Sequence, residues 1–395
     1  MVIYGSLSDS ALQRDGKLNM IYTRIIFWQI NPSPHQSSWI TELARQIPAA
    51  EIICVFQKGL SKERLALGWK LPEYENVTVY LAPKQDQLDQ ILNHHSERTI
   101  HVFSSVVSDK KIHEIFLRAL ATSAGVGLLS EGRDWRGWRG FLRQIHSVFH
   151  ERTYRKKVDF TLAIGEVGIR WFIKCEYKQS KVYPFCYVVE KPDKYVYEIA
   201  TEKVVRITAI GQLIYRKRFD ILIRALSKIS VYKWNLKIIG DGELRFDLQS
   251  LVENLGLQEQ VNFAGVLDNL MVRSELSHAD ILVLPSSWDG WGAVVNEALM
   301  SGVPVICSDF CGASDLIRPG FNGGVFKSES LDSLLCVINE WVGKGPLSQS
   351  EREKIINWSS CIEGEAVAKY FVEILEHVST KVESHPVAPW RICEL

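Results

Sequence analysis

Two acidic residues, Asp289 and Glu297, flank a glycine-containing turn within residues 286–304, SSWDGWGAVVNEALMSGVP. Asp289 lies in the turn, whereas Glu297 lies about one turn inside the next helix, roughly 6 Å along the axis from its start. Because two carboxylates so separated cannot act on one atom, they suit hydroxyl groups at opposite ends of an elongated ligand. Alternatively, Asp289 caps the helix and Glu297 is an ordinary solvated residue.

Local composition predicts the elements that hold these acids. Residues 279–285, ADILVLP, predict a buried parallel strand. Gly290 and Gly292 mark a turn, and residues 293–300 have helical character. In an open α/β sheet the loop of such a unit lies at the carboxyl end of the strand, where ligands bind, and the free N–H groups of the helix attract phosphate.

Two more strand-to-helix turns occur earlier in the chain. In IGQLIYRKRFD, Gly211 directly follows a strand, and Arg216 and Lys217 precede a helix. This arrangement can hold a diphosphate, with the lysine as a point charge, or it is a solvated basic loop. In IIGDGELR, Gly240 and Gly242 form a turn that either approaches a base or caps a helix.

Strand-like and helix-like segments alternate through most of the 395 residues, which exceed a single ordinary core and predict two α/β domains. The first set of predicted strands lies at residues 21–30, 50–56, 76–82, 99–105, 125–131 and 159–165. The second set lies at residues 204–213, 234–242, 260–266, 279–285 and 302–308. Residues 185–201 break the alternation and predict the linker. Two facing domains predict a ligand-binding cleft between them.

Composition excludes several classes of protein. Lys plus Arg and Asp plus Glu are both 46, so charge gives no support for a nucleic-acid partner. No apolar run approaches the 18 residues that a membrane span needs. Of eight cysteines only Cys307 and Cys311 are close, without a second pair at zinc spacing, which favours a reduced cytoplasmic protein. With no Asp-x-Asp motif, we expect neither an essential metal nor a cofactor.

The ordered motifs IGQLIYRKRFD, LKIIGDGELR, VNFAGV and ADILVLPSSWDGWGAVVNEALMSGVP resemble those of the retaining family-4 glycosyltransferases of the GT-B fold. The resemblance covers the second domain, with little motif support in the first. It implies two Rossmann-like domains facing each other across a cleft. A nucleoside-diphosphate sugar, UDP- or GDP-linked, then binds the second domain, and a glycan or lipid-linked acceptor binds the first.

The resemblance also implies domain boundaries. The acceptor domain spans residues 20–190 and the nucleotide-sugar domain 191–358, and residues 359–380 form a helix that returns to the first domain. Residues 1–19 are expected to be an extension with little structure, and residues 381–395 a loosely structured tail.

Roles of individual residues follow from matching the family motifs. Glu297 matches the acid that holds the ribose hydroxyls, Asp289 the acid at the donor sugar and Lys217 the lysine at the diphosphate. The predicted catalytic residues are Asp289, Lys217 and Glu131. The predicted donor-binding residues are Glu297, Gly211, Gln212, Arg216, Lys217, Gly240, Gly242, Gly265, Val266, Gly290, Trp291 and Gly292. The predicted acceptor-binding residues are His35, Glu131 and Arg133.

Three positions depart from the family pattern. Asp289 replaces a glutamate, which shortens the side chain by about 1.5 Å. Gln212 stands where many members carry arginine, and Arg216 or Arg218 is an alternative source of that charge. Glu131 replaces the histidine of a His-Gly pair and either binds acceptor hydroxyls, acts as a base, or pairs with a nearby arginine. His35 lies in an early loop, where a lone histidine is also often structural.

A basic aromatic segment spans residues 133–157, with eight Lys or Arg against two Asp or Glu. Trp135, Trp138, Leu142 and Ile145 are spaced for one helix face. Such a segment suits an anionic membrane surface, although an aromatic face packed inside the first domain is the alternative.

The sequence therefore predicts a retaining, metal-independent hexosyltransferase of polysaccharide or glycoconjugate biosynthesis, cytoplasmic and peripheral at the inner face of the membrane. A GT-B epimerase or phosphorylase would share the architecture. A non-catalytic sugar-nucleotide-binding protein is a further alternative, because Asp289, Gln212 and Glu131 depart from the family pattern.

Overall fold

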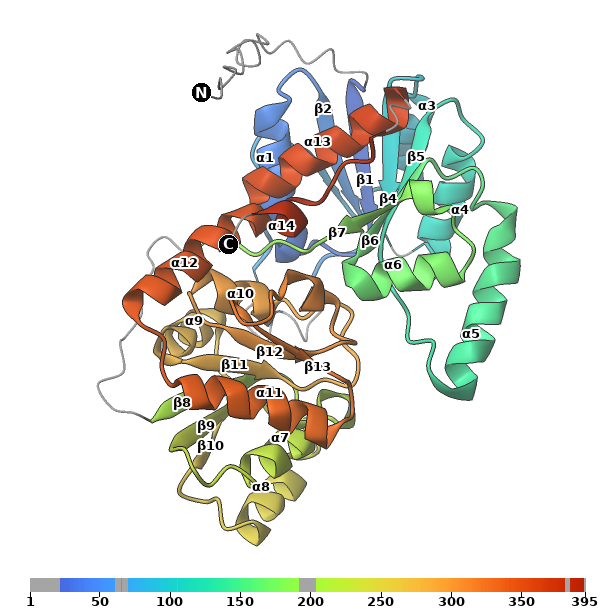
Figure 1. Cartoon of the computed structure of the whole chain (residues 1–395). Coiled ribbons are helices and arrows are strands. Elements are labelled where there is room, and N and C mark those ends of the chain that lie inside the picture. Colours follow the sequence, from blue (N-terminus) through green and yellow to red (C-terminus); the bar gives the residue numbers. More distant parts are fainter. Residues whose placement is uncertain are drawn as a thin grey trace, which may run out of the picture.

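The computed structural model describes residues 22–60, 65, 70–104, 106–191, 204–380 and 384–393. The described strands form two parallel sheets, and each sheet is packed against helices (Figure 1). The extension predicted at residues 1–19 lies outside the described residues, as does most of the predicted linker.

The first sheet has the strand order β3-β2-β1-β4-β5-β6-β7. Its strands are β1 (Arg24–Gln29), β2 (Glu51–Phe56), β3 (Thr78–Leu81), β4 (Thr99–Phe103), β5 (Gly125–Glu131), β6 (Phe160–Ile164) and β7 (Val182–Phe185). The helices described in this part of the chain are α1 (Pro34–Gln46), α3 (Gln85–Asn93), α4 (Lys110–Ala119), α5 (Gly137–His150), η1 (Glu151–Thr153), α6 (Gly165–Lys174) and η2 (Gln179–Lys181).

The second sheet has the strand order β10-β9-β8-β11-β12-β13. Its strands are β8 (Val205–Ile210), β9 (Trp234–Ile239), β10 (Val261–Gly265), β11 (Ile281–Leu284), β12 (Val305–Ser308) and β13 (Gly323–Phe326). The helices described between and after them are η3 (Tyr215–Lys217), α7 (Phe219–Leu226), α8 (Arg245–Asn254), α9 (Asn269–His278), α10 (Val294–Met300), η4 (Gly312–Leu316), α11 (Leu331–Lys344), α12 (Gln349–Ser359), η5 (Ser360–Ile362), α13 (Gly364–Thr380) and α14 (Pro389–Ile392).

Every strand expected from the sequence is present, and two edge strands were not expected. The central strands β4, β11 and β12 are buried along their whole length, as continuous apolar runs predict. β7 contains Pro184, which lowers strand propensity and is tolerated at a sheet edge. β13 begins with Gly323 and Gly324, and a Cβ on Gly323 would overlap the Val305 carbonyl of β12. Both edge strands therefore lack the β-branched pattern that identifies the others.

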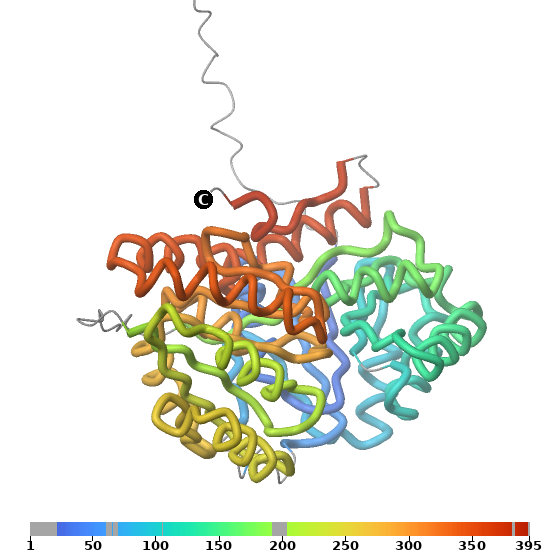
Figure 2. The backbone as a smooth tube through the Cα atoms, turned by 60° about the horizontal axis from the view of Figure 1, so that its bottom comes forward, coloured from blue at the N-terminus to red at the C-terminus, as the bar shows by residue number. Residues whose placement is uncertain are grey.

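The C-terminal helices connect the two domains (Figures 1 and 2). α12 lies on the second domain beside α10, whereas α13 packs along α1 of the first, with Phe371 against the Trp39 ring at 5.3 Å. The expectation of a loose tail after residue 380 is wrong for α14, because Trp390 is fully buried and its indole donates to Asp315 at 2.7 Å. Arg391 contacts Glu166 as well as Asp315, so α14 joins both domains.

Only part of the predicted basic aromatic segment forms one helix. α5 begins at Gly137, so Trp135 does not share its face, which corrects the prediction from spacing. Trp135 instead packs against Trp288 and Phe310 of the second domain, with ring centroids 5.7 and 5.5 Å away. The positive φ of Gly137 (65°) changes the direction of the chain between Trp135 and the rest of α5.

Candidate active site

Three glycine turns meet at the carboxyl ends of β8, β9 and β10. The Gly211 N–H donates to Ile239 O at 2.9 Å, and the Gly240 N–H donates to Gly265 O at 2.8 Å. A Cβ on Gly240 would overlap the Gly211 carbonyl, so the backbones touch only because this position lacks a side chain. The three predicted donor-binding glycines therefore form one continuous rim.

Neighbouring positions on this rim differ in exposure. Gly242 packs against the Leu213 carbonyl, which lies 2.6 Å from the position of an added Cβ. The side chains of Gln212 and Val266 are exposed to solvent. Gln212 and Val266 are therefore accessible to a ligand at the rim, whereas Gly242 allows its loop to pack against the loop that contains Leu213.

The predicted basic turn and the predicted acidic turn lie side by side. Lys217 Nζ donates to Asp289 Oδ2 at 2.5 Å, and both side chains are largely buried. Arg216 lies 3.8 Å from the same carboxylate and donates to Trp288 O at 2.6 Å. The Ser287 N–H in turn donates to Arg216 O at 2.8 Å. The basic turn therefore packs against the acidic loop, so it is not merely a solvated basic loop.

Asp289 is not a helix cap. Its N–H donates to Phe310 O and its carbonyl accepts from the Gly312 N–H, both at 3.0 Å, so it forms an isolated β-bridge with Cys311. α10 begins five residues later, with Ala293 at its N-cap position. The Asp289 carboxylate is thus directed to Lys217, and the capping interpretation is wrong.

Glu297 lies in the first turn of α10 and is partly buried. Burial raises the pKa of its carboxyl to about 7, and the charge of Arg273 partly opposes that shift. No hydrogen bond or ion pair links this carboxylate to another described residue. A partly buried acid without such a partner is suited to bind hydroxyl groups of a ligand.

Glu131 reaches the second domain from the end of β5. A Cβ on Gly290 would overlap the Glu131 Oε2 atom, so the carboxylate rests against the bare glycine. Burial raises the pKa of Glu131, as does Asp289, while a hydrogen bond from Tyr187 and the charge of Arg216 oppose the shift. Glu131 forms no salt bridge with Arg133 or Arg136 among the described residues, which rules out that alternative.

Close backbone contacts bring the domains together around this carboxylate. A Cβ on Gly165 of α6 would overlap the Gly312 carbonyl of the second domain. Arg170 donates to Asp309 O at 2.8 Å, and Asn296 donates to Tyr187 O at 3.0 Å. Glu131 and Asp289 therefore lie together at the interdomain contact.

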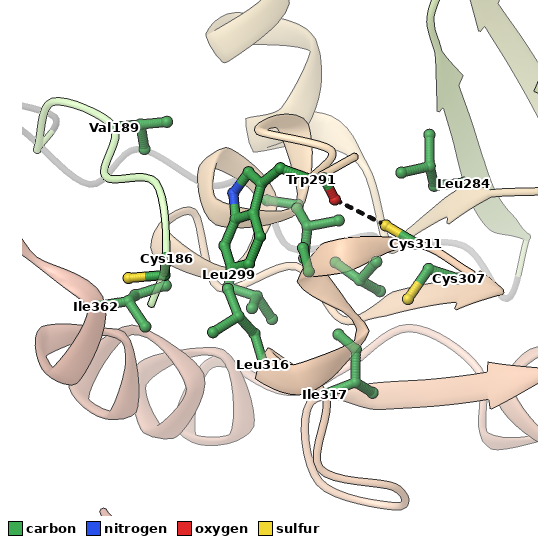
Figure 3. Packing of buried hydrophobic residues seen from close by; sticks show 14 of the residues in the cluster. Cys186, Val189, Leu284, Trp291, Leu299, Cys307, Cys311, Leu316, Ile317 and Ile362 are labelled. Carbon is green, nitrogen blue, oxygen red and sulfur yellow. Dashed lines mark hydrogen bonds between the residues drawn. The ribbon is translucent and has the colours of Figure 1, made fainter. Parts of the chain in front are cut away.

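Trp291 contributes to packing through its side chain (Figure 3). The ring is 3% exposed, and its Nε1 donates to Asn296 Oδ1 at 2.8 Å. The Trp291 carbonyl accepts from the thiol of Cys311 at 3.0 Å. This predicted donor-binding residue thus has only its backbone available to a ligand. Gly292 beside it has a φ of 94° and permits the turn into α10.

His35, in the first turn of α1, contacts Tyr187, and Arg133 lines the same cavity as Glu131. The His35 ring stacks on Tyr187 at 6.1 Å, and its carbonyl accepts from the Val188 N–H at 3.0 Å. The Arg133 guanidinium lies over the Trp171 ring at 5.9 Å.

Tyr187 and Asn296 belong to this region but were not predicted. Tyr187 lies in a segment expected to be a linker, and it contacts Glu131, His35 and Trp291. Asn296 is fully buried in α10 and links that helix to the first domain. The signal available in the sequence was the polar residue Asn296 directly before Glu297.

Two parallel-sheet domains that meet at the carboxyl ends of their strands define a protein of the GT-B fold, a class of glycosyltransferase architecture. Solved structures agree with this fold. The lipopolysaccharide outer core galactosyltransferase WaaB superposes with a TM-score of 0.65 and 16% identity over 91% of this chain and 99% of that one. HepE of Anabaena in complex with UDP gives a TM-score of 0.60 and 15% identity over the same shares.

Sequence comparison identifies the second domain more narrowly. Residues 197–358 match the model of the family described as glycosyl transferases group 1. A lipopolysaccharide core biosynthesis glycosyltransferase of Rhizobium meliloti is 35% identical over 118 residues, which are 30% of this chain and 33% of that protein. An uncharacterized glycosyltransferase of Methanocaldococcus jannaschii is 31% identical over 138 residues, 33% of this chain and 35% of that one. The chain thus spans about a third of the length of these curated relatives.

Proposed function

We propose that the protein is a glycosyltransferase that moves a sugar from a UDP-linked donor to a glycan or lipid-linked acceptor in polysaccharide biosynthesis. The observation that carries this proposal is the convergence of Lys217, Asp289 and the glycine rim at the carboxyl ends of the second sheet's strands. The relative from Rhizobium meliloti is named for lipopolysaccharide core biosynthesis, which supports the pathway class. Structures of HepE with UDP and with UDP-glucose support the choice of base.

The proposed donor lies along the second domain. Glu297 accepts hydrogen bonds from the ribose hydroxyls, and Asp289 accepts from a hydroxyl of the transferred sugar. Lys217 and Arg216 stabilise the charge that develops on the departing diphosphate, a role in which preorganised cations are most effective. The glycine rim allows the phosphates to approach the backbone closely.

The proposed reaction retains the anomeric configuration. The bond between the anomeric carbon and the diphosphate oxygen breaks, and the acceptor oxygen bonds to that carbon from the same face. Glu131 faces this position and binds an acceptor hydroxyl, whose proton leaves with the diphosphate. NMR of the first product formed tests this step, because an inverted anomer or a glycosyl group trapped on Asp289 would contradict it.

Thermal-shift measurements with UDP-, GDP- and ADP-sugars test the donor site, because a ligand that binds only the folded state raises Tm. We expect stabilisation by UDP-sugars, lost in Lys217→Ala and Glu297→Ala and kept in Lys228→Ala, which removes an exposed lysine outside the cleft. Transfer that requires an added acceptor would exclude an epimerase. Donor turnover absent from the wild type under all conditions would favour a non-catalytic binding protein.

We further propose that α5 docks on an anionic membrane surface. Its apolar side chains are exposed: Trp138 by 69%, Phe141 by 59%, Leu142 by 53% and Phe149 by 66%. Only Gly140 and Ser147 of this helix are buried, which contradicts the alternative that its aromatic face packs in the first domain. Figure 1 shows α5 at the periphery of that domain.

Charge and position favour this surface over a protein partner. Arg139 and Arg143 are exposed beside the apolar residues, as in helices that lie in the interface of anionic bilayers. α5 begins next to the cleft, because Arg136 at its N-cap contacts Ser328 and Glu329 of the second domain. A membrane-held acceptor would therefore arrive near Glu131. No helix in the described part of the chain is long and apolar enough to cross a bilayer.

Co-sedimentation with liposomes tests the membrane proposal. We expect binding to vesicles containing phosphatidylglycerol, weaker binding at high salt, and little binding to pure phosphatidylcholine. Phe141→Ser with Phe149→Ser should abolish binding. Phe246→Ser is the matched control, because that ring is 77% exposed on α8 of the other domain. Absence of binding to anionic vesicles at low salt would refute the proposal.

A further inference from the structure

A cavity of about 310 Å³ lies inside the first domain, behind Glu131. It is formed at the carboxyl ends of β4 and β5, below η1 and α6. Glu131 and Tyr187 are part of its lining, and the Glu131 carboxylate also contacts Gly290 beside Asp289, so the cavity adjoins the interdomain contact. Cavities of this size and position commonly hold small ligands.

Aromatic rings form much of the cavity wall. Trp171, Tyr154 and Tyr177 line it, and each is at most 6% exposed. Flat apolar rings beside polar groups suit the C–H faces of a sugar ring. The cavity is therefore chemically different from the glycine rim of the second domain, which presents backbone and charge.

The polar groups in the cavity include an uncommon buried acid. Glu151 is 3% exposed, and its carboxylate accepts a hydrogen bond from the Tyr177 hydroxyl at 2.8 Å. The hydroxyl of Tyr154, also buried in the lining, has no hydrogen bond of regular geometry with a described residue. Its interaction with Tyr177 is not a well-formed hydrogen bond, and a buried hydroxyl in that state costs free energy that a hydroxylated ligand would recover.

Arg133 supplies a positive charge to the same cavity. It lines the cavity and stacks near Trp171, but no carboxylate of the described residues lies within salt-bridge distance of it. Glu151 faces the same space without pairing directly with this guanidinium. A cation and an acid that share a cavity without touching can contact different parts of one ligand.

We propose that this cavity binds a sugar residue of the acceptor that carries an anionic substituent, a carboxylate or a phosphate. This inference rests on the proposed transferase function and specifies its acceptor. Arg133 binds the anionic group, Glu151 and Tyr154 bind ring hydroxyls, and the aromatic wall holds the ring. The hydroxyl that reacts points through the cavity mouth toward Glu131 and the donor sugar.

Binding of free sugars to the full-length protein tests this site. Saturating UDP is present throughout to occupy the donor site, and saturation-transfer NMR or calorimetry measures the affinity. The probes are glucuronate, glucose 6-phosphate and neutral glucose, so that the first two distinguish a carboxylate from a phosphate. We expect at least one anionic probe to bind about tenfold or more tightly than glucose, because charge-assisted hydrogen bonds are the stronger ones.

Variants separate the roles of the two charged residues. Arg133→Gln should weaken binding of the anionic probe by about tenfold to a hundredfold and leave glucose within about twofold. Glu151→Gln should weaken all three sugars, and Tyr154→Phe gives a milder version of that loss if the former variant folds poorly. Arg118→Gln removes an exposed guanidinium of α4 in the same domain and should change nothing.

Three results would overturn the proposal. The anionic probes bind no better than glucose, or Arg133→Gln binds them as tightly as Arg118→Gln does, or no sugar binds while UDP binds normally. The last result leaves the donor site intact, and is thus distinct from failure of the proposed function, in which UDP itself would not bind.

Discussion

Replacing Glu297 by glutamine should stabilise the free protein above neutral pH while weakening its binding of UDP. Burial raises the pKa of this carboxyl from 4.5 to about 7. The folded protein therefore holds the proton more tightly than the unfolded chain does. It follows that the free energy of unfolding falls as pH rises from about 4.5 to about 7, and stays lower above that range.

The size of the effect follows from the shift. A rise from 4.5 to about 7 corresponds to about 3 kcal/mol at 1.36 kcal/mol per pKa unit. Glutamine has nearly the same shape and no charge, so Glu297→Gln removes this cost. Since 1 kcal/mol moves the Tm of a domain of 150–250 residues by roughly 2–4 °C, the variant should melt roughly 6–12 °C higher at pH 8. At pH 4.5 the two proteins should melt at similar temperatures.

Thermal unfolding of wild type, Glu297→Gln and Glu259→Gln between pH 4.5 and pH 8.5 measures this difference. Glu259 is an exposed acid of the same domain, and its replacement controls for net charge. Calorimetric titration with UDP at pH 8 measures the functional cost. We expect the Kd of Glu297→Gln to rise about tenfold or more, because a charged acceptor of ribose hydrogen bonds becomes neutral.

Two observations would refute this reasoning. If Glu297→Gln is no more stable than Glu259→Gln at pH 8, ionisation of the Glu297 carboxyl does not lower the free energy of unfolding of the free protein. If UDP binds both variants equally, Glu297 does not hold the ribose. A gain in stability together with lost binding would be the trade-off expected of a residue kept for function.

Gly290→Ala should strongly reduce the transfer rate with little change in Tm, because its Cβ displaces the flexible Glu131 carboxylate. Gly59→Ala is the control, since a Cβ there meets no atom and should change neither quantity. In a double-mutant cycle of kcat, adding Gly290→Ala to Glu131→Ala should cause no further loss. Gly312→Ala should lower stability by about 1–3 kcal/mol in chemical denaturation, since its Cβ would overlap the fixed carbonyl of Gly290. EDTA should leave the transfer rate unchanged, because Lys217 and its neighbouring arginine supply the positive charge at the diphosphate; a loss restored by Mg²⁺ would contradict this.

The central strands were predictable from sequence because they are buried on both faces. Continuous apolar runs such as residues 281–284 and 305–308 have no other common interpretation when helices separate them. β7 and β13 are also largely buried but were missed, because Pro184 interrupts the first and two consecutive glycines begin the second. Trp135 was misplaced because helical spacing does not show where a helix begins, and here Gly137 turns the chain first.

Within the candidate site, sequence identified positions but not partners. Gly211, Gly240 and Gly290 stand out because each follows a strand, whereas the reason for each glycine lies in another loop. Gly240 touches Gly211, and Gly290 touches Glu131 about 160 residues away. Tyr187 gave no signal at all, because its role depends on the first domain's last strand delivering it to Glu131.

The shorter side chain of Asp289 is best understood from its backbone. Its N–H and carbonyl are both bonded to the segment around Cys311, so the loop cannot move outward to recover the lost methylene. Gly290 and Gly312 pack so closely beside that bridge that a Cβ on either residue would overlap a neighbour. In the proposed donor pose the sugar must therefore approach the loop more closely than a glutamate would require. Lys217, held at 2.5 Å by the same carboxylate, would be drawn toward the sugar end of the diphosphate.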